Sequence, residues 1–297
     1  MISPQPNDVI EIDKQEYRFF SMPQFPEIAY CEIGRKAKVY KLITDSGQSF
    51  ALKVFKPHFR SPRILEVCKK LAQYSKLPGM ELARRDVLTK ENNGPIIAKY
   101  PDLEFAVLMP WIEKEPWASV WIHDNRIDYL HSLSMTKSLS EVLLGLEEHG
   151  LAHTDLSGSN VLIDIKDGRV TLVGLETMFG HEFPEPENIP AGSPGYAHPN
   201  SAQAGQWCGE GDRFSASLLF AEILTISRKT VNQAHFGETF FSQNEIGEKS
   251  ERYSLMINEL HSTYGDLSKL FAKAWLSKNL KDCPTIHMWY ESLSNLK

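Results

Sequence analysis

The chain has 297 residues, of which 42% are hydrophobic and 24% are charged, and these values predict a globular protein with a large core. Its net charge of −6 and its pI near 6.0 argue against a nucleic-acid-binding surface, and no run of basic residues opposes that average. The four cysteines lie far apart without a C-x-x-C pair, which argues against a zinc site and a disulfide framework.

The first 26 residues contain repeated prolines and show no clean hydrophobic period. This pattern predicts that residues 1–26 form an N-terminal leader that is laid over the fold or loosely ordered. The start lacks the basic flank and the apolar run of a signal peptide, and no apolar stretch approaches membrane-spanning length. We therefore expect a cytoplasmic protein that does not contact a membrane.

Three strands are predicted next. Residues 27–33, 37–44 and 48–55 are rich in Ile, Val, Tyr and Phe, and the turn 45–47, Asp-Ser-Gly, is a typical hairpin turn. Alternation along the third strand turns Lys53 away from its apolar neighbours. Such a lysine points either into a site or to solvent.

A helix and a fourth strand follow. Ser61-Pro62 is typical of a helix start, and apolar residues then recur at helical spacing. Residues 105–112, Phe-Ala-Val-Leu-Met-Pro-Trp-Ile, predict a buried strand that ends at a proline. A second apolar helix leads into Glu148-His149-Gly150-Leu151.

The polar octet His153–Asn160, His-Thr-Asp-Leu-Ser-Gly-Ser-Asn, comes between this helix and the apolar run 161–163. An aspartate in such a loop can accept the proton of an attacking hydroxyl, and an asparagine five residues later can hold a metal ion against the same phosphates. Asp155 and Asn160 have this separation. By itself, the pattern also fits an ordinary loop.

This octet resembles the catalytic loop of the protein kinase superfamily, H-R-D-L-x-x-x-N, with Thr154 in place of the arginine. The resemblance implies an α+β, two-lobed fold, in which a small antiparallel sheet with one main helix precedes a mainly helical lobe. The implied ranges are 27–109 for the first lobe, 110–112 for the hinge and 113–297 for the second lobe.

The resemblance also implies an ATP site. Lys53 lies in Ala51-Leu52-Lys53-Val54, which resembles the V-A-I-K strand, and it would bind the α and β phosphates. Glu66 on the following helix would pair with Lys53, and Glu81 is the alternative. Of the glycine-rich loop G-x-G-x-x-G-x-V only the middle glycine remains, and without the resemblance it is a hairpin glycine. The implied ATP contacts are Gly34, Val39, Ala51, Lys53, Glu66, Met109, Pro110, Ile112 and Leu162.

The strongest departure from the family follows the strand 170–173. Protein kinases have D-F-G here, whose aspartate binds magnesium, whereas this chain has Gly174-Leu175-Glu176. Loss of that carboxylate is expected to weaken magnesium binding at Asn160 and the stabilisation of the transition state. Glu176 is either a replacement ligand or an incidental acid.

The segment 174–200 corresponds to the activation segment of the family. It contains no Ser, Thr or Tyr between Thr177 and Ser193. The arginine with which the family binds a phosphate on this segment is replaced by Thr154. We therefore expect no control by phosphorylation within that stretch. Its acidic, proline-rich part, residues 182–190, is a candidate partner surface.

Further landmarks follow this segment. Residues 192–200 resemble G-T-P-x-Y-x-A-P-E with Asn200 for the glutamate, and Cys283 stands where its arginine partner is expected. Asp212 opens a buried helix in a D-x-W-S-like context, where it would cap the helix and tie down the backbone of the catalytic loop. Residues 228–252 are predicted to be a surface excursion, with closing helices from Tyr253.

The resemblance implies an ATP-binding domain that is either a pseudokinase or a weakened Ser/Thr protein kinase, more similar to the bacterial, eukaryotic-like kinases than to the animal ones. Asp155, Lys53 and Asn160 would carry the transfer of the ATP γ-phosphate to a protein hydroxyl, with weakly bound Mg2+ at Asn160 and Glu176. The expected partners are ATP and a protein. Two alternatives remain: a small-molecule phosphotransferase similar to antibiotic kinases, whose loop is often followed by D-x-E, and a non-catalytic signalling scaffold.

Overall fold

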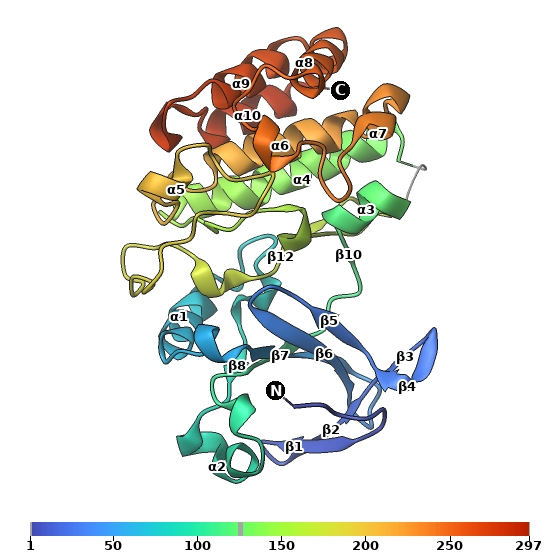
Figure 1. Cartoon of the computed structure of the whole chain (residues 1–297), viewed down its shortest axis with the longest axis vertical. Helices are drawn as coiled ribbons and strands as arrows, with labels where there is room; N and C mark the ends of the chain where they lie inside the picture. The colour runs from blue at the N-terminus through green and yellow to red at the C-terminus, as the bar shows by residue number, and fades with distance from the viewer. Residues whose placement is uncertain (1, 124–126, 297) are drawn as a thin grey trace. The chain divides into compact units, whose positions relative to one another are not determined.

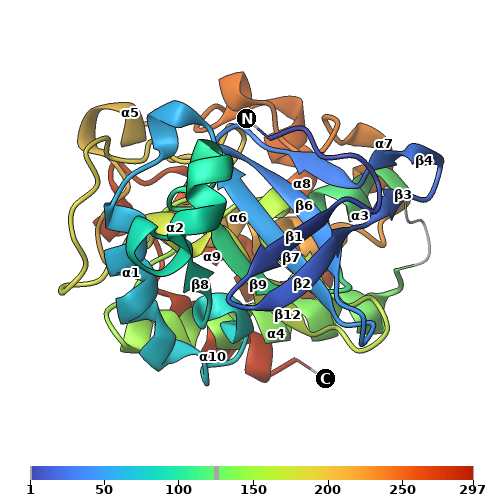
Figure 2. The same ribbon diagram turned by 90° about the horizontal axis from the view of Figure 1, so that it is seen from below.

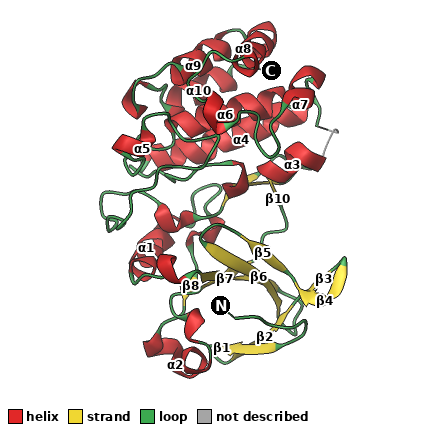
Figure 3. Ribbon diagram, in the orientation of Figure 1, coloured by secondary structure: helices red, strands yellow, loops and turns green. Residues whose placement is uncertain are grey.

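The computed structural model describes residues 2–123 and 127–296 (Figure 1). The chain divides into two compact units. Unit 1 comprises Met1–Ser75 and Leu82–Glu113, and unit 2 comprises Lys76–Glu81 and Lys114–Lys297. The fold class is α+β, because unit 1 contains a curled antiparallel sheet and unit 2 is mostly helical (Figure 3).

The sheet of unit 1 has seven strands, and all its pairs are antiparallel. The turn 45–47 joins β6 to β7 as predicted, with Gly47 at a φ of 84°. A separate ribbon is formed by β3 (Ser21–Met22) and β4 (Phe25–Ala29). The strand order is β1 (Val9–Ile12), β2 (Gln15–Phe19), β6 (Ala37–Ile43), β7 (Ser49–Phe55), β9 (Val107–Pro110) and β8 (Asp86–Val87), and β5 (Cys31–Ile33) pairs with β6.

The predicted leader, residues 1–26, is wrong for the part that forms β1 and β2 (Figure 2). Their inward side chains, Ile10, Ile12, Tyr17 and Phe19, are buried in the same core as the inner faces of β6, β7 and β9. Each strand has only four or five residues and alternates with charged residues on the outer face, so the hydrophobic period is too short to stand out between the prolines.

Unit 1 contains two α-helices where the resemblance implies one main helix. The predicted helix is α1 (Arg63–Leu71), whose first N–H donates to Ser61 Oγ at 3.2 Å. The second helix, α2 (Lys90–Lys99), begins at Thr89, which accepts from the Asn92 N–H at 3.3 Å. Its interior reads Asn-Asn-Gly-Pro, which is typical of a turn, and the helix is kinked at Asn93.

Residues 76–81 were expected in the first lobe but belong to unit 2. The Gly79 carbonyl accepts from Leu172 N–H at 2.8 Å, and Gly79, with a φ of 73°, lies so close to Val142 that a Cβ would come within 2.5 Å of it. The Glu81 carboxylate accepts from the Thr171 hydroxyl at 3.1 Å. These contacts attach the segment to the strand and helix of unit 2.

Unit 2 is built around α6 (Arg213–Thr225), whose residues from Phe214 to Thr225 are all buried, as the apolar pattern predicts. Helix α6 packs against α4, α8 and α9. The small sheet of this unit has the order β10-β11-β12. The elements are β10 (Glu115–Pro116), β11 (Val161–Ile163), β12 (Val170–Leu172), α3 (Trp117–His123), α4 (Tyr129–Glu148), α5 (Ser201–Ala204), α7 (Lys229–Ala234), α8 (Glu251–Tyr264), α9 (Asp266–Trp275) and α10 (Ile286–Ser294).

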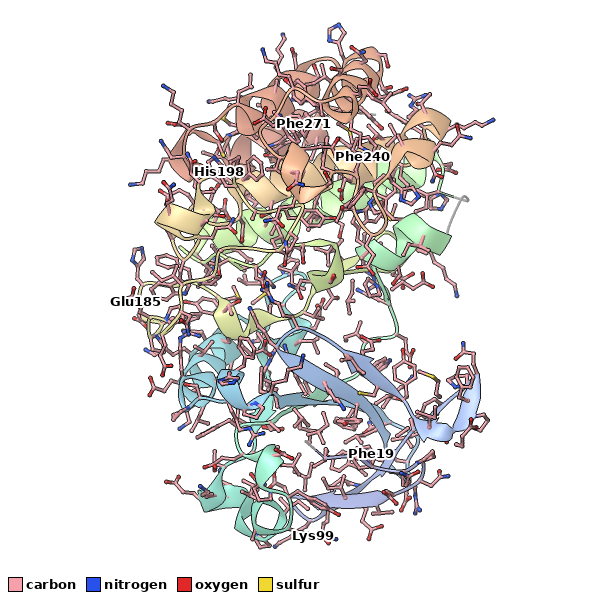
Figure 4. The ribbon with its side chains drawn as sticks, viewed as in Figure 1. Phe19, Lys99, Glu185, His198, Phe240 and Phe271 are labelled. Atoms are coloured by element: carbon pink, nitrogen blue, oxygen red, sulfur yellow. The ribbon has the colours of Figure 1, made fainter. Side chains whose placement is uncertain are left out.

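Residues 228–252 are more than a surface excursion. Phe240 and Phe241 are completely buried in this segment (Figure 4). The ring of Phe241 lies 4.4 Å from Trp275, and that of Phe240 lies 6.1 Å from Trp121. Because polar residues surround this pair in the sequence, the apolar pattern does not predict that it is buried. Across the described residues, no helix combines the length and apolar character required to cross a membrane.

Candidate functional site

The backbone of the predicted catalytic loop is held by one buried carboxylate. Asp212 accepts from the His153 N–H at 2.5 Å and from the Thr154 N–H at 2.8 Å. The predicted tie between Asp212 and the loop is therefore present. The predicted cap is wrong, because Asp212 occupies the N-cap position of α6 without a side-chain cap hydrogen bond. Burial raises the pKa of the Asp212 carboxyl, while the two N–H donors oppose that shift.

Thr154 adopts a backbone conformation that a β-branched residue rarely takes, with a φ of 64°. Its hydroxyl donates to the Thr177 carbonyl at 2.8 Å. The preceding His153 is completely buried, and its Nε2 donates to the Val173 carbonyl at 2.7 Å while its Nδ1 accepts from the Asp155 N–H at 3.3 Å. Contacts on both sides thus hold the loop in a strained form.

Asp155 and Asn160 are brought together as predicted. The Asn160 Nδ2 donates to the Asp155 carbonyl at 2.7 Å, and the Asp155 Oδ1 accepts from the Ser193 hydroxyl at 2.8 Å. Only 8% of the Asp155 surface is exposed. The carboxylate is therefore shown accepting a hydrogen bond from an alcohol, which is the interaction that a general base makes with an attacking hydroxyl.

Gly174 is in the left-handed region, with a φ of 77°, at the start of the 3₁₀ turn Leu175–Thr177. A Cβ at this position would lie 2.7 Å from Asn160 Oδ1. The Val173 N–H donates to the Asn160 carbonyl at 3.0 Å, which holds the two segments side by side. The space for an aspartate side chain is thus occupied by the amide of Asn160.

The predicted metal ligands fit a divalent ion poorly. Asn160 offers a neutral amide oxygen, whereas magnesium sites in proteins usually include one or two carboxylates. Glu176 is buried, with 7% of its surface exposed. In the part of the chain that the structure describes, no three His, Cys, Asp or Glu side chains are grouped to hold a metal. Any site at Asn160 would therefore depend on oxygens from the phosphates.

An open groove of about 550 Å3 lies beside the loop within unit 2. Ser157 and Ser159 of the loop line it together with Ser193, the hydroxyl partner of Asp155. Its other side is formed by residues 236–243 and includes Phe236, with 55% of its surface exposed. The sequence does not predict this groove, because its far wall comes from the segment interpreted as a surface excursion.

The acidic, proline-rich stretch 182–190 has three exposed glutamates, and Glu185 lies at the edge of the molecule in Figure 4. Phe183 within it is buried. The stretch follows the short bridge between Ala152 and Phe179, which anchors the preceding residues to the loop. Its role as a partner surface stays a prediction.

Asn200 and Cys283, the two positions where the resemblance implies that the family has an ion pair, make uncharged contacts. Asn200 Nδ2 donates to the Lys278 carbonyl at 2.6 Å, and the buried Cys283 lies 3.2 Å from the Ser277 hydroxyl. His198, also buried, accepts at Nδ1 from the Asn200 N–H at 3.1 Å (Figure 4). Its Nε2 therefore carries the proton and donates to the carbonyl of Ser277, 3.2 Å away.

We expect the His198 contact to weaken the protein in acid. Burial lowers the pKa of His198, and Ser277 and Asp282 oppose that shift. As the pH falls, the imidazole is therefore protonated in the unfolded chain before it is protonated in the folded chain. The stabilising contribution is present above the unfolded pKa of about 6.5 and is lost as the pH falls below it. Urea unfolding at pH 7.5 and 5.5 checks this. The stability difference between wild type and His198→Gln should shrink at the lower pH, and an unchanged difference would contradict the assignment.

A second group of candidate residues lies in unit 1. Val39, Lys53 and Val107 are direct cross-strand neighbours, and Ala51 pairs with Met109 two residues away. All five therefore share one face of the sheet, opposite the face that packs into the core. The Lys53 ammonium lies 5.4 Å from the ring centre of Phe55 on the same face. The predicted orientation of Lys53, away from Leu52 and Val54, agrees with this register.

The remaining predicted contacts are less constrained. Gly34 donates its N–H to the Ala37 carbonyl at 2.9 Å, so that donor closes the hairpin instead of facing a ligand. Glu66 is exposed on α1, and Glu81 bonds to Thr171 in unit 2. Pro110, at the end of β9, is exposed. Ile112, just after β9, and Leu162, on β11, are half-buried.

A scan against models of protein families finds no match, and a search of curated proteins finds none either.

Proposed function

We propose that the chain is a protein-kinase-like ATP-binding domain with the two-lobed arrangement of that family, and that it is either a pseudokinase or a weakened Ser/Thr kinase. The observation that carries the proposal is the hydrogen bond from a serine hydroxyl to Asp155, in a loop that Asp212 holds at two backbone positions. Phosphoryl transfer to an alcohol needs a carboxylate placed in this way.

A polypeptide substrate is favoured over a small molecule by the groove. It is open and continues from Ser193 along residues 236–243, a shape in which an extended segment can lie, whereas small-molecule sites enclose most of the ligand surface. The Gly192–Asn200 segment on its near side resembles the substrate-binding segment of peptide kinases. We therefore place the acceptor hydroxyl at Asp155 and the flanking substrate residues in the groove.

Each of the three predicted catalytic residues has a task in this proposal. Lys53 binds the α and β phosphates of ATP, Asp155 accepts the hydroxyl proton, and Asn160 supplies an oxygen toward the metal. A bound magnesium ion would neutralise charge on the β and γ phosphates. Because the carboxylate of D-F-G is replaced by Gly174, we expect this contribution to be small and phosphoryl transfer to be slow or absent.

A non-catalytic scaffold is the second candidate, and the packing of Gly174 against Asn160 favours it. In that case nucleotide binding would stabilise one arrangement of the chain and a protein partner would recognise it. Both the scaffold and the weak kinase are expected to bind ATP, but only the kinase transfers its γ-phosphate.

We expect ATP to bind, and Lys53→Met to weaken that binding by about tenfold to a hundredfold, since a hydrogen bond to a charged group contributes about 1.5–3 kcal/mol. Calorimetric titration of ATP with and without Mg2+ measures both effects. Because Gly174 stands where D-F-G supplies a carboxylate, Mg2+ should change the affinity by less than about tenfold. Lys38→Met is the matched control, because Lys38 pairs with Val54 and so lies on the other face of the same sheet.

Equal affinities for wild type and Lys53→Met would remove the phosphate role of Lys53. Absence of ATP binding to the wild type would contradict the proposal as a whole. With binding established, incubation with radiolabelled ATP and a generic protein substrate separates the weak kinase from the scaffold.

A further inference from the structure

Glu222 is a completely buried carboxylate on α6 with no task in the proposed reaction. Three donors from distant parts of the chain meet on it. Its Oε2 accepts from Trp117 Nε1 at 3.0 Å and from the Tyr196 hydroxyl at 2.8 Å, and its Oε1 accepts from the Phe240 N–H at 3.0 Å. All three partners donate, which an ionised carboxylate satisfies and no neutral side chain of that size does.

Each donor belongs to a different wall of the groove. Tyr196 itself lines the groove, Trp117 precedes the lining residue Ala118, and Phe240 lies between the lining residues Thr239 and Phe241. The three segments lie far apart in the sequence, and Glu222 bonds to each of them. One carboxylate therefore fixes the spacing of the groove from behind.

Tyr196 also connects this carboxylate to the loop that carries Asp155. Its hydroxyl packs against Gly158, where a Cβ would come within 3.0 Å of it. Its N–H donates to the Ser193 carbonyl at 3.0 Å, and the Ser193 hydroxyl donates to Asp155 at 2.8 Å. Displacement of Tyr196 would thus change the shape of the groove and the position of Asp155, the candidate base.

We propose that Glu222 is the positioning residue of the groove, holding its three walls and, through Tyr196 and Ser193, the alignment of Asp155. What the groove binds rests on the proposed function, but the positioning role does not. Burial raises the pKa of Glu222, and its hydrogen-bond donors, the Phe240 N–H first among them, oppose that shift.

The first test uses hydrogen exchange of residues 192–197 and 236–243, measured by mass spectrometry without nucleotide. Tyr196→Phe deletes one donor and keeps the ring, and we expect exchange to rise about tenfold in both segments, although only one contains the substitution. Tyr264→Phe is the matched control, because that buried hydroxyl also donates to α6, at the Leu224 carbonyl, 2.9 Å away. It should leave both segments unchanged. A change confined to residues 192–197 would overturn the proposal.

The second test asks whether hydrogen-bond polarity, and not packing alone, is responsible. Glu222→Gln keeps the shape but turns an NH2 group toward a donor. If the NH2 faces Tyr196 and Trp117, the tyrosine hydroxyl can rotate and accept, whereas the indole N–H cannot. Adding Trp117→Phe to Glu222→Gln should therefore restore part of the lost protection in residues 236–243, although Trp117→Phe alone reduces it.

If the double variant loses as much protection from exchange as the two single variants together, the positioning role is contradicted. That result is the one expected if Glu222 and Trp117 act only by filling space. Trp289→Phe is the control for the indole, since Trp289 donates to Ser217 on the same helix, at 3.1 Å, without facing the groove. It should not rescue Glu222→Gln. Neither test requires ATP, so failure of ATP binding would remove the proposed function and leave these outcomes to decide the role of Glu222.

Discussion

Asp212→Ala is expected to lower the free energy of unfolding of unit 2 by about 3 kcal/mol, because two buried N–H groups lose their acceptor and each such loss costs about 1–3 kcal/mol. The groups are those of His153 and Thr154, and both residues are buried. Relief of the buried charge and of the strained φ of Thr154 offsets part of the cost. We also expect any phosphoryl transfer to disappear, since the same two bonds hold the backbone next to Asp155.

Urea denaturation followed by tryptophan fluorescence measures this effect, because five of the six tryptophans lie in unit 2. Asp128→Ala is the matched control. Asp128 is also an N-cap aspartate, but it is exposed, and its Oδ1 contacts His131 of its own helix, accepting from the N–H at 2.9 Å with the ring Nδ1 also 2.9 Å away. Its replacement should cost clearly less. Similar losses in the two variants would show that the bonds from Asp212 to the loop add little stability and would remove its assigned role there.

Local patterns predict the parts of the fold that depend on neighbouring residues. The hairpin of β6 and β7, the orientation of Lys53 away from Leu52 and Val54, and the buried helix after Asp212 each follow from alternation, turn residues or all-round apolarity over ten residues or so. The approach of Asp155 and Asn160 is equally local, since only four residues lie between them. The resemblance in the loop therefore rests on features that the structure also brings together.

Features that depend on long-range packing are not visible in the sequence. Short strands β1 and β2 become core elements only because β6, β7 and β9, which come later in the chain and join them in one sheet, add apolar side chains to the same core. Phe240 and Phe241 lie in a polar segment, yet they are buried by aromatic rings far along the chain. The role of Glu222 is invisible for the same reason, because a glutamate inside an apolar helix pattern gives no sign of its three donors.

The absence of an aspartate at position 174 illustrates a different limit. The sequence shows which residue is missing, and the natural expectation is that Gly174→Asp restores the metal ligand and raises phosphoryl transfer. It does not show that the backbone is left-handed there or that the Asn160 amide fills the space. A side chain at position 174 and the amide of Asn160 would thus compete for one space, and a single substitution changes only one of the two.

Gly174→Asp is accordingly expected to destabilise unit 2 by about 2–3 kcal/mol and to give no gain in phosphoryl transfer. A residue with a Cβ costs about 1–2 kcal/mol in the left-handed region, and displacing Asn160 breaks its hydrogen bond to the Asp155 carbonyl, which adds about 1 kcal/mol. Urea denaturation and a radiolabelled-ATP assay measure the two effects.

Gly47 provides the control for the backbone term alone, because its φ is 84° and a Cβ there would meet nothing within 4 Å. Gly174→Ala should therefore cost more than Gly47→Ala, and the difference reports the contact with Asn160. Removing that contact by adding Asn160→Ser should recover part of the stability of Gly174→Asp, because the shorter side chain vacates the space that the new carboxylate needs. If Gly174→Asp alone raised metal-dependent transfer, Asn160 would have to move aside at little cost, and the chain would be a kinase that lacks only one ligand.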